Sequence, residues 1–91
     1  MNMQMNTLNE KSCFYKALGD PIRLRIIEFL LNEKKCTCIC HLSKHLNRDQ
    51  SVIFRHVQVL KSVGILNTIK ESKYLMCCIK DKDKLRKMLE N

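Results

Sequence analysis

Sulfur is concentrated in one short stretch of this chain. Three cysteines and a histidine fall within six residues, Cys36-Thr37-Cys38-Ile39-Cys40-His41. A thiolate is the soft ligand that selects thiophilic metals, and it is also the form of cysteine that oxidants attack. This composition predicts a site whose chemistry occurs at sulfur, either by binding an ion or by oxidation.

The spacing of the three cysteines decides whether they can share one ion. Residues two apart in a helix point to nearly opposite sides, so Cys36, Cys38 and Cys40 converge only if the segment before Cys40 is extended or irregular. We expect residues 34–37 to form a loop, which permits this convergence. As(III) takes three thiolates, whereas Cd, Pb or Zn takes a fourth ligand, and Cu(I) is a further thiophilic candidate.

A fourth ligand has two candidates, His41 and Cys13, the latter from the same or a second subunit. Two other interpretations stay open. The thiols could pack as small hydrophobic side chains, or Cys36, Cys38 or Cys40 could form a reversible disulfide with another of the three or with Cys13.

The last two cysteines are neighbours on a predicted strand. Adjacent strand residues face opposite sides, so we expect Cys77 in the core with Leu75 and Ile79, and Cys78 outside. A disulfide between adjacent residues would be strained, and the two thiols are poorly placed to hold one ion together.

The elements that position these residues follow from the spacing of apolar side chains. Helical spacing predicts five helices, over residues 8–18, 21–31, 40–46, 50–63 and 81–91. After Gly64 the period changes to two, which predicts strands over residues 66–70 and 74–79 joined by a turn at 71–73. The fold class is therefore mostly α with a small β-hairpin.

Several residues mark where these helices begin and end. Gly19 is expected to end the first helix in the left-handed conformation. Asp20 and Pro21 are suited to the cap and the first position of the second helix. In the turn at 47–49, Asn47 suits a left-handed conformation and Asp49 suits a helix cap.

Two helices joined by a three-residue turn and followed by a hairpin are typical of a winged helix-turn-helix, whose second helix enters the DNA major groove. The chain has 17 Lys and Arg against 9 Asp and Glu, a net charge of +8, which favours a polyanionic partner. Side chains near the start of the second helix are the candidates for DNA contact: Gln50, Ser51, Phe54, Arg55 and Gln58. Lysines around it are the candidates for phosphate contact: Lys44, Lys61, Lys70 and Lys73.

Length and composition bound the rest. The 91 residues make one small domain, residues 7–91, after a flexible arm at 1–6, and we expect its core to be completed across a dimer interface. No segment is long enough to span a membrane, and the first six residues lack the features of a signal peptide, so we expect a cytoplasmic protein. In that compartment six cysteines favour metal binding or redox activity over structural disulfides.

Three blocks of the sequence resemble the ArsR/SmtB winged-helix repressors. Residues 17–27, ALGDPIRLRII, are similar to the family pattern A-L-[AGS]-D-P-x-R-[LR]-x-I-[LI]. Residues 38–42, CICHL, are similar to the metal-box C-V-C-D-L, and residues 50–66 resemble the recognition helix and its exit. The resemblance implies a homodimer that binds a palindromic operator as a repressor and dissociates when an inducer binds. It also implies a dimer interface built from residues 8–18 and 85–89.

The chain also departs from this family's pattern. His41 stands where the family has Asp, Cys36 is an additional thiol, and Arg48 replaces an apolar turn residue. The last helix contains no histidine, which argues against the zinc site that other members have there.

Together these observations predict a dimeric transcriptional repressor that is released from its DNA operator by a thiophilic metal or metalloid, As(III), Cd, Pb, Zn or Cu(I). The closest alternative keeps DNA binding and replaces the metal by reversible disulfide formation. A more remote alternative is a small thiol-disulfide enzyme. It lacks a Cys-x-x-Cys sequence on a βαβ scaffold and leaves the basic helix-turn-helix unexplained, so we expect no enzymatic activity.

Overall fold

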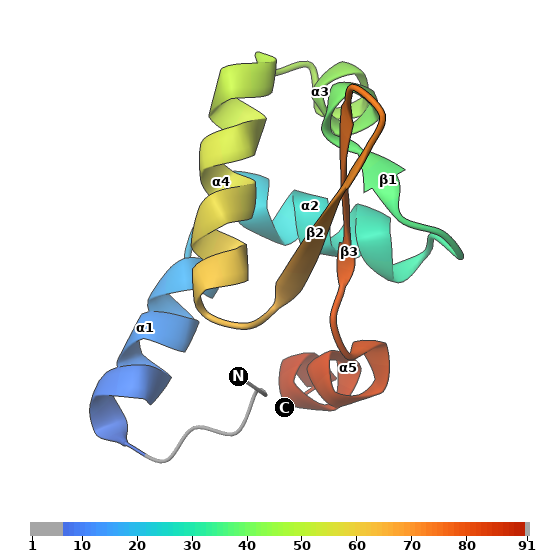
Figure 1. Ribbon diagram of the computed structural model, residues 1–91. Coiled ribbons are helices and arrows are strands. Elements are labelled where there is room, and N and C mark those ends of the chain that lie inside the picture. Colours follow the sequence, from blue (N-terminus) through green and yellow to red (C-terminus); the bar gives the residue numbers. More distant parts are fainter. Residues whose placement is uncertain (1–6, 91) are drawn as a thin grey trace.

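In the computed structural model, residues 7–90 are described, and they form five helices and three strands. The helices are α1 Leu8–Leu18, α2 Pro21–Leu31, α3 Ile39–Leu46, α4 Gln50–Ser62 and α5 Lys82–Glu90, and the strands are β1 Thr37–Cys38, β2 Leu66–Glu71 and β3 Tyr74–Ile79. In Figure 1, α4 runs beside the β2–β3 hairpin, with α3 at one end of the hairpin and α5 at the other. The predicted fold class is confirmed, while the expected arm at residues 1–6 lies outside the described residues.

The strand β1 was not predicted, because residues 34–37 were expected to be a loop. Thr37 lies opposite Cys77 and Cys38 opposite Met76, so β1 adds a third antiparallel strand in the order β1-β3-β2. A strand of two residues has no periodicity to detect, and its pairing partner is distant in the sequence. As a result α3 begins at Ile39, directly from the sheet (Figure 1).

The starts of α1 and α2 both have polar caps, and the Asp20 cap of α2 is the predicted one. The Thr7 hydroxyl accepts a hydrogen bond from the Glu10 amide at 3.1 Å. The Asp20 carboxylate accepts bonds from the amides of Ile22 at 2.8 Å and Arg23 at 3.2 Å. Desolvation acts to raise the pKa of Asp20, but these two amides, with the charges of His56 and Arg23, outweigh it and hold the pKa below its ordinary value of 3.8.

Two predicted helix caps, one at the end of α1 and one at the start of α4, differ from the structure. Gly19 has φ of −82° and therefore does not use the left-handed conformation expected of it. Asp49 precedes α4 but makes no capping hydrogen bond through its side chain. The prediction for Asn47 is confirmed, because its φ of 54° lies in the left-handed region.

The core lies between the helices and the inner face of the sheet. Its most deeply buried side chains come from every helix and from the two longer strands: Phe14, Ile26, Ile27, Leu30, Leu42, Ile53, Val57, Leu60, Ile65, Leu66, Cys77 and Leu85. Cys77 is buried as predicted and donates its S–H to the Thr37 carbonyl oxygen at 3.4 Å. Burial, with the charges of Cys78 and Cys36, raises the pKa of Cys77 to about 12, so this thiol stays protonated at neutral pH. Cys78 and Leu75 are each half-buried, whereas Cys78 was expected outside and Leu75 in the core.

Helical spacing predicts Arg23 on the outer face of α2, but in the structure it is half-buried and joins three helices. Its Nε donates to Nδ1 of His56 on α4 at 3.0 Å, and its Nη1 donates to the Ala17 carbonyl of α1 at 3.4 Å. Helical spacing shows that a side chain avoids the core, but it does not show that a long side chain lies along a neighbouring helix. The guanidinium therefore holds α4 to the end of α1.

Candidate nucleic-acid interface and thiol site

The turn between α3 and α4 is fixed by backbone hydrogen bonds. The amide of Asn47 donates to the Lys44 carbonyl at 3.3 Å, and the amide of Arg48 donates to the Ser43 carbonyl at 3.1 Å. The Ser43 hydroxyl also donates to the Arg48 carbonyl. These bonds satisfy carbonyls at the end of α3 and set the direction in which α4 begins.

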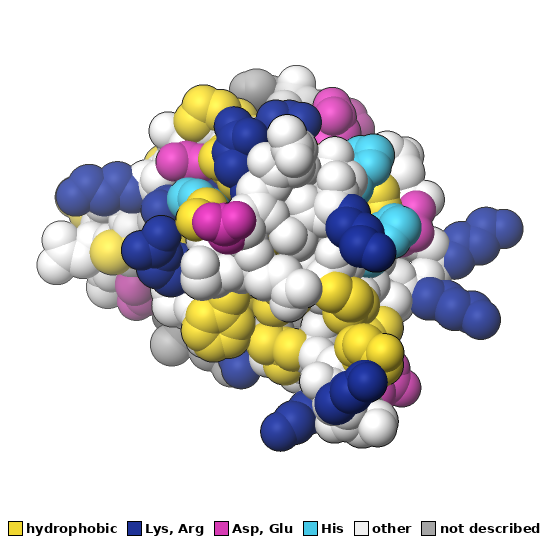
Figure 2. Space-filling model, turned by 90° about the horizontal axis from the view of Figure 1, so that it is seen from above, with side chains coloured by type: hydrophobic (Ala, Val, Ile, Leu, Met, Phe, Trp, Pro, Cys, Tyr) yellow, Lys and Arg dark blue, Asp and Glu magenta, His cyan; other side chains and the backbone are white. Residues whose placement is uncertain are grey.

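The first two turns of α4 present the predicted polar residues to solvent. Gln50, Ser51 and Arg55 are exposed, and Phe54 is 43% exposed, while Gln58 is half-buried. On the opposite side of the helix, Ile53, Val57 and Leu60 are buried in the core. Figure 2 looks onto the end of the molecule where α3, the start of α4 and the hairpin turn lie, and Lys and Arg side chains project around its edge.

The four predicted lysines differ in their surroundings. Lys44 and Lys70 are exposed. Lys73 lies at the hairpin turn, with its Nζ 5.5 Å from the centre of the Tyr74 ring. Lys61 donates from Nζ to the Thr68 hydroxyl at 2.8 Å, so it links the end of α4 to β2. The Lys61 ammonium is thus held by the protein itself.

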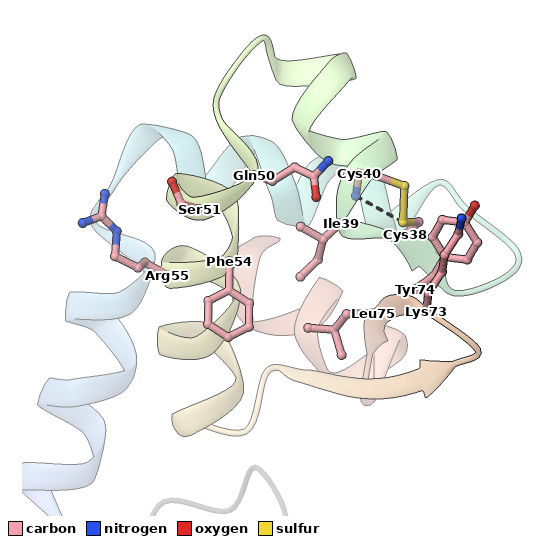
Figure 3. Close-up of a pocket in the computed structure, with 10 residues that line it drawn as sticks. All are labelled: Cys38, Ile39, Cys40, Gln50, Ser51, Phe54, Arg55, Lys73, Tyr74 and Leu75. Carbon is pink, nitrogen blue, oxygen red and sulfur yellow. Dashed lines mark hydrogen bonds between the residues drawn. A yellow bond between two sulfur atoms is a disulfide. The ribbon is translucent and has the colours of Figure 1, made fainter.

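A groove of about 720 Å³ brings several of these residues together with sulfur. It lies between the start of α3, the start of α4 and the hairpin, and is lined by Cys38, Ile39, Cys40, Gln50, Ser51, Phe54, Arg55, Lys73, Tyr74 and Leu75. Figure 3 shows Ile39, Phe54 and Leu75 pointing toward one another in its middle, while the Arg55 guanidinium extends away from them. Basic, amide and hydroxyl groups thus surround an apolar floor, an arrangement that can contact phosphates and base edges.

Sequence reasoning missed three of these groove residues, Ile39, Tyr74 and Leu75. Tyr74 is 46% exposed although it is aromatic, and it directly follows the basic turn residue Lys73. The sequence signal for Tyr74 was its position as an aromatic residue next to the predicted hairpin turn at residues 71–73. The half-buried Leu75 was instead expected in the core, and Ile39 was not assigned to any site.

Cys38 and Cys40 form a disulfide at one end of this groove, with their Cα atoms 5.2 Å apart (Figure 3). Cys38 is also the residue that precedes α3, and its sulfur accepts a hydrogen bond from the Cys40 amide at 3.2 Å. The sulfur occupies the position where an oxygen of Ser, Thr or Asp usually caps a helix. The start of α3 therefore depends on the chemical state of this sulfur.

The other predicted ligands lie elsewhere. Cys36 is half-buried against Cys78, and Cys13 is exposed on α1. His41 lies against the Phe29 ring on α2, with the ring centres 5.6 Å apart. Among residues 7–90, no three His, Cys, Asp or Glu side chains are close enough to hold one metal ion. Once their disulfide is reduced, Cys38 and Cys40 would offer two thiolates within one chain, which is fewer ligands than As(III), Cd, Pb or Zn takes.

No helix within the described part of the chain is long and apolar enough to cross a membrane.

Comparisons with known proteins agree with this geometry. Residues 20–68 match the model of the family described as "Bacterial regulatory protein, arsR family". An uncharacterised HTH-type transcriptional regulator of Methanocaldococcus jannaschii is 34% identical over 76 residues, which cover 84% of this chain and 83% of that protein. The match to the family model spans the second, third and fourth helices and reaches into β2.

Two further relatives have names that refer to metals or metalloids. The cadmium resistance transcriptional regulatory protein CadC of Listeria innocua is 29% identical over 77% of this chain and 58% of its own length. The arsenical resistance operon repressor of Escherichia coli is 36% identical over 67% of this chain and 51% of its own length. The chain therefore spans only about half the length of these two proteins.

Solved structures with the same fold include reduced HlyU from Vibrio cholerae, with a TM-score of 0.76 and 26% identity over 90% of this chain and 83% of that one. A homodimeric winged helix-turn-helix DNA-binding domain, Mb0332 of Mycobacterium bovis, has a TM-score of 0.79 at 20% identity, covering 91% and 77% of the two chains. The architecture in Figure 1 is thus that of a winged helix-turn-helix.

Proposed function

Because this chain belongs to the arsR family, whose members are DNA-binding transcriptional regulators and not enzymes, we propose that it is a homodimeric repressor that senses an inducer at Cys38 and Cys40. The observation that carries the proposal is that these two sulfurs line the same groove as Gln50, Ser51 and Arg55. DNA contact and sulfur chemistry would then share one surface.

The DNA-binding part of the proposal follows from the exposed face of α4. In a helix-turn-helix the residues near the start of the second helix reach base edges, while the wing contacts the backbone. Arg55 can bond to guanine and Gln50 to adenine, and the amine of Lys73 can neutralise a phosphate. Two subunits would place two such helices in successive major grooves.

Coupling between inducer and DNA is proposed to act through the cap of α3. A change at the Cys38 sulfur alters the acceptor for the Cys40 amide, and α3 is joined to α4 by the hydrogen-bonded turn at 47–49. An inducer can shift the equilibrium only by its difference in affinity for the free and DNA-bound forms. For DNA to be released, α3 in the inducer-bound protein must therefore take a position that fits DNA less well than its position in the inducer-free protein.

The identity of the inducer has two candidate classes. A thiophilic metal or metalloid is supported by the names of the two relatives above and by the soft sulfur donors. Oxidation is supported by the disulfide between Cys38 and Cys40. It is also supported by the small number of potential metal ligands that the described residues of one chain bring together. In the oxidative case two thiols and one hydroperoxide give the disulfide, an alcohol and water.

Anaerobic titration of the reduced protein with As(III), Cd, Zn and Cu(I) tests the first class. Sulfur-to-metal absorption that saturates at a fixed stoichiometry, together with release of a duplex selected for binding, is the result expected for a metal sensor. If none of the four ions binds and the duplex is released on mild oxidation, the inducer belongs to the oxidative class.

The double variant Cys38→Ser, Cys40→Ser tests the position of the sensor. Serine is a good helix cap through oxygen, so α3 should stay capped and operator affinity should stay within about twofold of the parent. Release by inducer should be lost, whereas the matched variant Cys13→Ser should be released normally. If the double variant still dissociates on inducer addition, the sensor lies at other residues.

A further inference from the structure

Two of the four cysteines outside the groove, Cys36 and Cys78, face each other across the sheet. The pairs Thr37 with Cys77 and Cys38 with Met76 define the antiparallel register of β1 and β3. Extending this register by one residue places Cys36 opposite Cys78. Opposite residues of antiparallel strands have Cα atoms about 4.5–5.5 Å apart, within the range of about 4.4–6.8 Å that a disulfide spans.

Contacts between the side chains agree with this register. The Cys78 thiol is hydrogen-bonded to that of Cys36, and both residues are half-buried. Both also line a second cavity, of about 200 Å³, which is enclosed by Leu30, Glu33, Lys34, Lys35, Ile79 and Lys82. This cavity shares no lining residue with the groove that contains Cys38 and Cys40.

Lysines make the surroundings of the pair basic. Lys82 begins α5, donates to the Glu33 carbonyl, and its charge favours the thiolate of Cys78. Burial is the larger effect and, with the hydrogen bond and charge of Cys36, raises the pKa of Cys78 to about 11. Cys78 is therefore a protonated thiol at neutral pH that sits next to an ammonium group.

We propose that Cys36 and Cys78 form a reversible cross-strand disulfide, a redox site separate from Cys38 and Cys40. The oxidant is a low-molecular-weight disulfide. The Cys36 thiolate attacks one of its sulfurs, which forms a mixed disulfide and releases one thiolate. Cys78 then attacks the Cys36 sulfur, loses its proton and releases the second thiolate. Two protein thiols and one small disulfide thus give one protein disulfide and two small thiols.

The new bond joins two segments that hold α3 and α5. Cys36 ends the loop between α2 and β1, and Cys78 lies at the end of β3 just before α5. Closing a loop of this length restricts the unfolded chain, so the oxidised form should melt roughly 10 °C or more above the reduced form. This inference does not depend on sensing by Cys38 and Cys40.

The test uses the full chain carrying Cys13→Ser, Cys38→Ser and Cys40→Ser, which leaves Cys36, Cys77 and Cys78. After complete reduction it is treated with oxidised glutathione, and the products are measured by intact mass and by fragmentation of the linked peptides. We expect loss of two hydrogens with no glutathione attached, a link between Cys36 and Cys78, and the higher melting temperature.

Two added substitutions identify the resolving thiol. With Cys78→Ser, the mixed disulfide on Cys36 should persist and its glutathione mass should be retained. With Cys77→Ser the link should still form, and if that variant fails to fold, fragmentation between residues 77 and 78 of the parent gives the same assignment. Persistent glutathione on Cys36 in the parent, or a link from Cys36 to Cys77, would overturn the proposal.

Discussion

Arg55 is the residue on α4 that we propose to read a base. It is exposed, it lies in the second turn of α4, and its guanidinium extends away from the apolar floor of the groove (Figure 3). Its neighbours on the same face, Ser51 and Gln58, have shorter side chains with fewer donors. Removing the guanidinium should therefore change DNA affinity more than it changes folding.

Arg55→Ala is expected to weaken binding to a selected duplex by about 1–3 kcal/mol if the side chain reads a base. Its unfolding free energy should change by no more than about 0.5 kcal/mol, because the position is exposed. The measurement is a gel shift at fixed salt, with Lys35→Ala in the loop before β1 as a control that also removes one positive charge. Full affinity of Arg55→Ala would exclude Arg55 from the interface.

Sequence reasoning identified most of the residues that line the groove but not the arrangement of the sulfurs. Gln50, Ser51, Phe54 and Arg55 follow from helical periodicity, which is a local property of the chain. The partner of Cys36 depends on pairing with a strand some 40 residues away in the chain, and local spacing carries no information about it. The sequence placed Cys36 with Cys38 and Cys40, whereas the fold places it with Cys78.

At the scale of elements, caps and turns fix how the helices meet. Asp20 begins α2 with two amide hydrogen bonds, and its low pKa means that it is a carboxylate at neutral pH. The hairpin turn contains Ser72 in the left-handed region, at φ of 57°, which directs Lys73 and Tyr74 toward the groove. Each feature has a measurable consequence.

Asp20→Ala should lower the unfolding free energy by about 1 kcal/mol at neutral pH, because two amides lose their acceptor. The folded pKa lies below 3.8, so the carboxylate's contribution is present above that pH and is lost as the pH falls through the folded pKa. Urea unfolding at pH 7 and at about pH 3 should therefore show a smaller difference between Asp20→Ala and the parent in acid.

The matched variant Asp20→Asn keeps a capping oxygen that does not titrate. It should stay close to the parent at neutral pH and retain its cap in acid. A loss for Asp20→Ala that is equal at both pH values would show that the carboxylate's charge makes no contribution to the cap.

The wing, which is the β2–β3 hairpin, is expected to contact DNA phosphates through its positive charges and not to recognise bases. If Lys70 and Lys73 each contact a phosphate, the double variant Lys70→Gln, Lys73→Gln should lower affinity for all duplexes alike. The slope of log affinity against log salt should flatten by about one unit per lost contact. Lys34→Gln, Lys35→Gln removes the same charge from the loop before β1 and should leave the slope nearly unchanged. Equal slopes for both double variants would place the wing away from DNA.

At the scale of the whole molecule, the chain leaves apolar side chains exposed on its first and last helices. Leu8 is 82% exposed and Tyr15 60% exposed on α1, and Leu89 is 40% exposed on α5. A chain with a Cα radius of gyration of 12.7 Å has a small core, and covering these side chains with a second copy would add to it. The fold could be predicted from the sequence because each helix has its own periodic spacing of apolar residues. The use of this surface as a dimer interface was instead expected from the family resemblance.

Tyr15→Glu is expected to convert a dimer into a monomer, because a carboxylate would enter an apolar interface without a partner. The measurement is sedimentation equilibrium, followed by DNA titration, in which affinity for a two-half-site duplex should fall at least tenfold. In the sedimentation measurement Ile69→Glu is the control, since Ile69 is 51% exposed on β2, away from α1 and α5. A dimer for Tyr15→Glu that is as tight as the parent's would place the interface on another surface.

The Arg23 side chain has a consequence for the DNA sequence that such a dimer would choose. One guanidinium holds His56 on the recognition helix and the carbonyl of Ala17 at the end of α1. If α1 forms the subunit contact of the proposed dimer, this side chain would help to set the distance between its two α4 helices. Half-sites read by such a pair are separated by about 34 Å, one turn of the duplex. Lysine has a single point charge and cannot hold both acceptors in a fixed fork. Arg23→Lys should therefore broaden the range of half-site separations that the protein accepts, while the bases preferred within each half-site stay the same.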